Sequence, residues 1–120
     1  MSNFHNVVEV SARKQYKCAE CCGEILVGEK YFRHSYVQDG DFGSYKLDAC
    51  CEKIISEVIS ETSIYDVDNI VIGEIYEQFE FHDSELEWLT AYIDNQAKRN
   101  AKPSQFLIDR RDRLLVITNE

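Results

Sequence analysis

The chain has 120 residues, of which 44% are hydrophobic and 12% aromatic, and its formal net charge is −9. This length and composition fit one folded domain and exclude a disordered chain. No apolar stretch approaches the roughly 18–20 residues needed to cross a bilayer, and "MSNFHNVVEV" lacks the basic start and apolar block of a secretory signal. We therefore predict a cytoplasmic protein whose cysteines are metal ligands or free thiols rather than disulfides.

The first half of the chain predicts strands and turns. "NVVEVSA" indicates a short strand, and "CAECCG" indicates a turn with metal-binding chemistry. Two aromatic and β-branched runs, "YFRHSYV" and "YKL", flank the turn-forming "QDGDFGS" and predict a β-hairpin. From Asp48 onward the apolar residues follow helical spacing, and Asp48 lies where a helix N-cap belongs.

Helical patterns dominate the second half. One helix is predicted from near Asp68, although Gly73 inside it costs about 1 kcal/mol relative to alanine. Its apolar stripe consists of Ile72, Ile75, Tyr76 and Phe79. A further helix opens at Ser84 with a capping-box pattern, since Glu87 follows three residues later. Its stripe is expected at Leu86, Leu89, Ile93 and Ala97, with Trp88 and Tyr92 beside it. The tail "SQFLIDRRDRLLVITNE" is compatible with a short helix followed by a strand, but its pattern does not settle the assignment.

The cysteines are spaced for a zinc site, which takes at most four ligands. Because adjacent side chains diverge, Cys21 and Cys22 are not expected to bind together, and Cys18 pairs with one of them. Asp48 and Cys51 have the i, i+3 relation of a first helical turn, whereas Cys50 points about 100° away from Cys51. Asp48 is either a ligand or a plain N-cap. In the second case Cys50 or His34 is the substitute ligand, or the chain binds no zinc at all.

The spacing "C-x2-C-x3-I-x2-G-E-x-Y", the hairpin containing "DG" and the ligand pair after "YK" resemble small treble-clef zinc proteins of phage and prophage type. The resemblance covers residues 10–80 and includes "IGEIYEQ". It implies a structural zinc ion held by Cys18, Cys21, Asp48 and Cys51. Cys22 then stands where the family has glycine, and Asp48 where it has cysteine. Gly23 is expected to supply the positive φ that Cys22 disfavours, and Cys22 and Cys50 to be small buried thiols.

The fold that this implies is α+β. A treble-clef-like zinc module of knuckle, β-hairpin and helix occupies residues 1–62. A helical extension over residues 63–120 packs on it to give one compact domain. No histidine lies in "DACCEKIISE", where a treble-clef nuclease carries its metal ligands, so we expect a protein that is not an enzyme.

The acidity is concentrated in the middle of the chain. Residues 51–95 hold twelve acidic residues and one basic residue, a net charge of −11, whereas residues 96–120 carry +3. Such a field repels nucleic acid and favours a basic partner protein. The expected partner-binding face consists of Glu74, Glu77, Glu80, Asp83, Glu87 and Trp88.

Charge and resemblance together favour a phage-type inhibitor in the host cytoplasm. Its target would be a nucleic-acid-binding defence protein, blocked in an anti-CRISPR-like or nucleic-acid-mimic manner. The alternative is a zinc-dependent DNA- or RNA-binding module with a basic patch of Lys98, Arg99, Lys102, Arg110, Arg111 and Arg113. The plain interpretation of the acidic segment is a solvated face that keeps the protein soluble.

Overall fold

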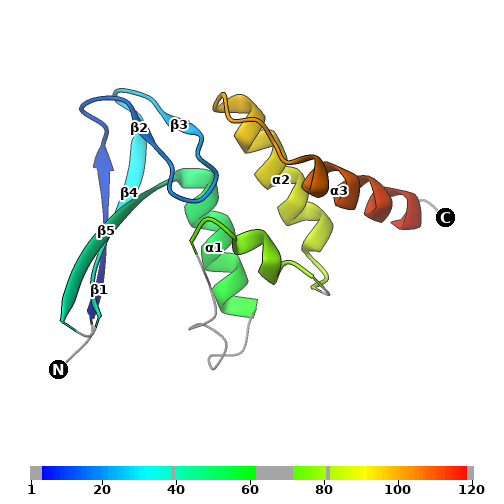
Figure 1. Cartoon of the computed structure of the whole chain (residues 1–120), viewed down its shortest axis with the longest axis horizontal. Helices are drawn as coiled ribbons and strands as arrows, with labels where there is room; N and C mark the ends of the chain where they lie inside the picture. Colours follow the sequence, from blue (N-terminus) through cyan, green and yellow to red (C-terminus); the bar gives the residue numbers. More distant parts are fainter. Residues whose placement is uncertain (1–3, 39, 62–71, 81, 119–120) are drawn as a thin grey trace.

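The computed structural model describes residues 4–38, 40–61, 72–80 and 82–118, and its fold is α+β, as predicted (Figure 1). A three-stranded antiparallel sheet has the order β1-β4-β5, with bounds Phe4–Ser11, Lys30–Gln38 and Asp41–Asp48. A two-stranded ribbon pairs β2 (Tyr16–Lys17) with β3 (Glu24–Ile25). The helices are α1 (Ala49–Glu61), the 3-10 helix η2 (Ile75–Gln78), α2 (Glu85–Lys98) and α3 (Gln105–Thr118).

The predicted hairpin is β4–β5, and its strands are longer than the sequence runs that indicated it. Gln38 pairs with Asp41, so the connection has two residues, and its Gly40 has a φ of 87° that favours glycine. Gly43 allows a close approach, because a Cβ there would lie 2.3 Å from the Tyr36 ring. The hairpin is therefore set by a glycine turn and by aromatic packing across the strand pair.

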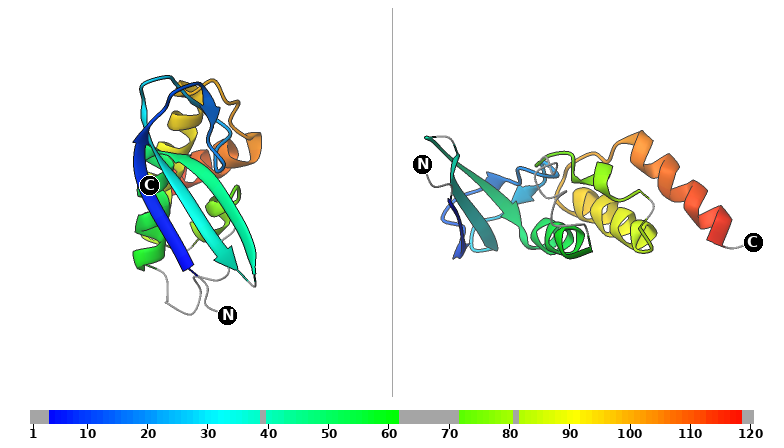
Figure 2. Two further views of the ribbon diagram at one scale, coloured as in Figure 1. Left: turned by 90° about the vertical axis from the view of Figure 1, so that its left-hand side faces the viewer. Right: turned by 90° about the horizontal axis from the view of Figure 1, so that it is seen from below.

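The elements are arranged in layers along the long axis of a molecule that measures 51 × 36 × 19 Å. The sheet lies at one end, α1 packs against its β4 and β5 strands, α2 packs on α1, and α3 lies at the far end (Figures 1 and 2). The core fills the space between these layers. Its largest fully buried side chains include Ile25, Leu47, Phe79, Trp88, Leu89 and Tyr92. None of the helices described has both the length and the apolar character of a membrane span.

The helix predicted from Asp68 is present only as the short η2 among the residues that the structure describes, and Asp68 itself lies outside them. Gly73 has a φ of 103°, which ends any helix at that point. The buried Glu20 carboxylate then accepts the Gly73 N–H at 2.9 Å, and its Oε2 accepts the Ile75 N–H at 3.3 Å and the Tyr92 hydroxyl at 2.8 Å. This carboxylate connects η2 to the turn between β2 and β3, in which Glu20 lies.

Helix α2 begins where it was predicted, but its buried face is rotated. Ser84 makes no side-chain capping bond, and Ala97, expected in the apolar stripe, is exposed. The residues that α2 buries are Trp88, Leu89, Tyr92, Ile93, Asn95 and Gln96. The undecided tail forms the single helix α3. The inward position of Asn95 and Gln96 brings polar groups to the cysteines.

Candidate metal centre

Cys18 and Cys21 are presented by the turn between β2 and β3. The Cys18 N–H donates to the Gly23 carbonyl at 2.8 Å, and the Cys22 N–H donates to the Cys18 carbonyl at 3.0 Å. The Gly23 N–H lies 3.4 Å from Cys21 Sγ, the geometry of a backbone amide that supports a thiolate. These bonds fold the turn so that both thiols point inward, and Cys18 and Cys21 are only 1% and 2% exposed.

Asp48 and Cys51 lie at the junction of β5 and α1. Asp48 is the last residue of β5, and its Oδ1 accepts the Cys51 N–H at 2.8 Å, which is the bond of a helix N-cap. Its Oδ2 lies 3.2 Å from Cys21 Sγ. The two oxygens therefore have different neighbours. Oδ1 caps the N-terminus of α1, and Oδ2 faces Cys21 Sγ in the turn between β2 and β3.

The structure brings all four predicted ligands together. The ligand atoms of Cys18, Cys21, Asp48 and Cys51 lie within 4.8 Å of one another, and all four residues are buried. Two sulfurs on one tetrahedral zinc ion lie roughly 3.8 Å apart, given a Zn–S distance of about 2.3 Å. The cluster is thus compact enough to hold one metal ion.

The remaining candidate ligands lie elsewhere. Cys22 was predicted to be buried, but it is exposed, because it takes the left-handed φ of 63° that was expected at Gly23. Cys50 is half-buried, and its Sγ lies 3.9 Å from the Ala91 carbonyl oxygen of α2. His34 lies on β4, where it hydrogen-bonds to His5 of β1 and to Glu52 of α1. None of these three side chains joins the cluster. Among the residues that the structure describes, the cluster therefore consists of the four predicted ligands.

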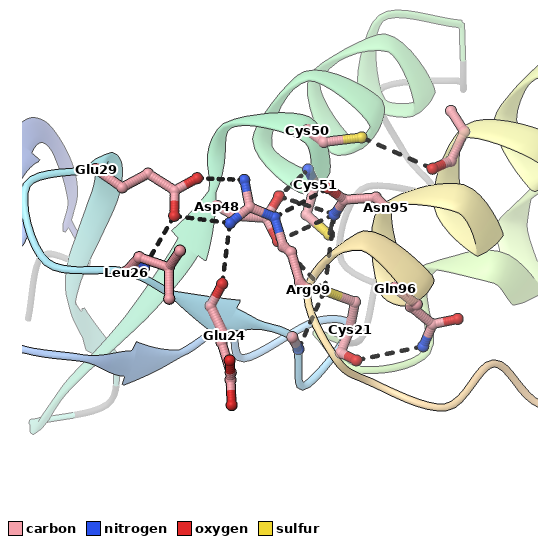
Figure 3. A network of polar contacts seen from close by, with 12 residues as sticks. Cys21, Glu24, Leu26, Glu29, Asp48, Cys50, Cys51, Asn95, Gln96 and Arg99 are labelled. Atoms are coloured by element: carbon pink, nitrogen blue, oxygen red, sulfur yellow. Dashed lines mark hydrogen bonds and ion pairs between the residues drawn. The ribbon is translucent and has the colours of Figure 1, made fainter.

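Two residues that sequence reasoning missed, one in α2 and one at its C-cap, complete the surroundings of the cluster (Figure 3). Asn95 Nδ2 lies 3.1 Å from each oxygen of Asp48 and 3.8 Å from both Cys21 Sγ and Cys51 Sγ. Arg99 Nε lies 3.4 Å from Asp48 Oδ2 and donates to Asn95 Oδ1 at 2.9 Å. The guanidinium also donates to Glu29 Oε1 at 2.8 Å. Their signal in the sequence is the i, i+4 spacing of Asn95 and Arg99 on α2.

The pKa shifts within the cluster oppose ionisation of all four groups at once. Hydrogen bonds from Cys21 and Cys51 lower the pKa of Cys18, whereas donation to Cys18 raises the pKa of Cys21 and of Cys51. Burial raises the pKa of Asp48, and the nearby Cys18 adds to this effect. One thiolate is therefore stabilised by its neighbours. A bound divalent cation would favour deprotonation of the whole set.

The expected partner-binding face is exposed except for its aromatic member. Trp88 is 1% exposed, and its indole Nε1 donates to Glu57 Oε2 at 2.8 Å, so it belongs to the core. Glu80 lies 3.9 Å from Arg110 in a loose ion pair. The acidic residues that stand exposed are Glu74, Glu77, Glu80, Asp83 and Glu87.

The basic patch consists of three exposed side chains and three that pair with carboxylates. Arg99 contacts Glu29 and Asp48, Arg110 is buried against Glu85, and Arg111 lies 3.8 Å from Asp94. Only Lys98, Lys102 and Arg113 of the six are exposed. Comparison with protein-family models, curated protein sequences and solved structures finds no match for this chain.

Neighbouring cysteines provide a matched test of the ligand set. Cys18→Ser, Cys21→Ser and Cys51→Ser should each lose the bound metal, because each removes a thiolate from a site of four. Cys22→Ser and Cys50→Ser should retain it. Elemental analysis of protein purified without chelator measures the metal content. Metal loss in Cys50→Ser with retention in Cys51→Ser would contradict the assignment.

Asn95→Ala should weaken metal affinity by about 10–100-fold, the usual effect of removing a group that orients a ligand. The amide holds the Asp48 carboxylate, which otherwise rotates toward water or Arg99. Affinity is measured by competition with a chelator of known strength, and the exposed Asn6→Ala is the control. Equal affinities for Asn95→Ala and Asn6→Ala would remove Asn95 from the site.

Proposed function

We propose that the cluster binds zinc and that this zinc stabilises the fold rather than taking part in a reaction. Three thiolates with one carboxylate in a compact group suit zinc, whereas magnesium and calcium prefer oxygen ligands. The observation that carries the proposal is that the cluster is closed to solvent. Each of the four ligand residues is at most 2% exposed, and Asn95 and Arg99 cover the carboxylate. A catalytic zinc instead keeps one position open for water or substrate.

The order of the elements supports a treble-clef module. The β2–β3 turn provides the first ligand pair, the β4–β5 hairpin follows, and the first turn of α1 provides the second pair. In such a module the zinc ion links two segments that share few apolar contacts of their own, and its binding energy becomes folding energy. The proposal therefore assigns the protein a structural metal and no catalytic residue.

Removal of the zinc ion should unfold the region around the knuckle and the start of α1. Without the cation, the buried thiols and Asp48 must take up protons or remain as uncompensated charges, and both outcomes cost free energy. Circular dichroism and thermal unfolding, before and after treatment with a strong chelator, measure the effect. Added zinc should restore the original unfolding temperature. A chelated protein with an unchanged unfolding temperature would contradict a structural role.

We further propose that the protein acts by binding a basic protein through an acidic surface, which we define as Glu74, Glu77 and Glu87 with the neighbouring Asp83. These side chains are exposed, and they lie in the segment that carries most of the negative charge. Like charges on one surface steer an oppositely charged partner and speed association. Pairing of Arg99, Arg110 and Arg111 within the protein favours this partner class over nucleic acid.

Charge reversal tests the acidic surface. Changing Glu74, Glu77 and Glu87 to lysine should abolish capture of proteins that the unchanged chain captures, while zinc content and unfolding temperature stay the same, because exposed charges contribute little to stability. The captured proteins are quantified by mass spectrometry at low and high salt.

The matched control reverses Glu9, Asp41 and Asp109, which are exposed on other elements. It makes the same change in net charge at a different place. Proteins captured by the unchanged chain and by the control, but lost with the first variant, identify partners of the acidic surface. Equal capture by both variants would show that the acidic segment acts only as a solvated face.

A further inference from the structure

A second group of metal-binding side chains lies on the sheet, apart from the cysteines. His5 on β1 and His34 on β4 face each other, with 2.7 Å between His5 Nε2 and His34 Nδ1. The other ring nitrogen of His34, Nε2, lies 2.6 Å from Glu52 Oε2 on α1. The His34 ring stacks on Tyr45, with ring centroids 4.6 Å apart. Four elements thus meet at one buried imidazole.

Glu52 determines which nitrogen of His34 is free to bind. A carboxylate accepts hydrogen bonds, so His34 Nε2 carries the proton that is donated to Glu52. A neutral His34 then has a lone pair on Nδ1, directed at His5. This carboxylate–imidazole arrangement is the one that orients histidine ligands in metal sites and raises their basicity.

His5 offers the opposing lone pair. Its neutral ring carries one proton, which sits either on Nε2, in the hydrogen bond to His34, or on Nδ1. In the second tautomer two lone pairs face each other across a short distance, and only a cation between them makes that arrangement favourable. Partial desolvation of the otherwise exposed His5 ring, followed by the neighbouring His34, lowers the pKa of His5, which favours the neutral ring that binds metal.

We propose that His5 and His34 form a second metal site, which takes a divalent transition-metal ion that prefers imidazole ligands. Nickel, copper and zinc are such ions. Two nitrogens on one ion lie roughly 3.0–3.4 Å apart, so the imidazoles must separate slightly. His5 is exposed and lies near the end of an edge strand, and its ring can make this movement. Water fills the remaining positions.

This site differs from the cysteine cluster in chemistry and in access. It has two nitrogen ligands instead of three sulfurs and an oxygen, and one of its rings is open to solvent. Burial raises the pKa of the nearby Tyr45 to about 12, so its hydroxyl stays neutral. The protein therefore supplies only the two imidazoles, water completes the coordination, and the ion exchanges readily. When bound, the ion links β1 to β4 near the N-terminal end of β1.

Nickel is the probe, because it favours imidazole ligands over the closed set of thiols and carboxylate. Isothermal titration of the zinc-loaded full chain with nickel chloride should show one binding event per chain. His5→Ala should weaken that binding at least tenfold, and Glu52→Gln by about 10–100-fold, since it removes the charge that orients His34. His82→Ala is the matched control, because His82 lies 3.7 Å from Glu61 in a similar half-exposed pair.

Two further measurements make the result decisive. Zinc content after the titration should be unchanged, and NMR ring signals of His5 and His34 should broaden with paramagnetic nickel while those of His82 do not. The same nickel affinity for the unchanged chain and for His5→Ala overturns the proposal. Nickel uptake matched by release of zinc overturns it as well.

Discussion

The carboxylate of Asp48 joins three parts of the molecule. Its Oδ1 accepts the Cys51 N–H and begins α1, its Oδ2 faces the thiol of Cys21 in the knuckle, and both oxygens accept from Asn95 of α2. A cysteine at this position would supply a stronger zinc ligand but only one acceptor atom. The aspartate therefore exchanges some metal affinity for a bond to each neighbouring element. The strand end, the helix start and the metal geometry depend on the orientation of this one side chain.

The C-terminal end of α2 packs closely against Gly23 in the turn between β2 and β3. A Cβ on Gly23 would lie 2.7 Å from Arg99 Cβ, so the approach needs glycine at position 23. The Arg99 guanidinium then spans from Asp48 to Glu29, and the Arg99 carbonyl accepts the Glu24 N–H at 2.9 Å. The C-terminal half of the chain thus supplies groups that compensate the buried charges of the cluster. For this reason we expect metal binding at the cluster and the packing of α2 to support each other.

The sequence predicted the ligands because their spacing is local. Cys18 and Cys21 share a turn, Asp48 and Cys51 share a helical turn, and each pair can be read within four residues. Asn95, Arg99 and Glu20 act across 44 to 75 residues, and no local pattern indicates such contacts. The same limit explains the rotated face of α2: Asn95 and Gln96 turn inward and donate to Asp48 and to the Cys21 carbonyl, whereas periodicity counts only apolar residues. Cys22 was misplaced because a cysteine can take the left-handed turn conformation at a moderate cost in strain.

The first turn of α1 carries the two clusters on its two sides. Cys51 points to the knuckle, and Glu52 points to His34 on the sheet, because successive residues of a helix are turned by about 100°. A negative charge in this turn is favourable, since the unpaired N–H groups of a helix start attract anions. The turn therefore holds the Glu52 carboxylate at little electrostatic cost, whereas donation to Cys18 raises the pKa of the Cys51 thiol. Any change in the position of α1 that followed loss of a metal ion from the cluster would move Glu52 as well, and with it the proton that fixes the His34 tautomer. The two clusters are separate in ligands and access, but they share this turn as a mechanical support.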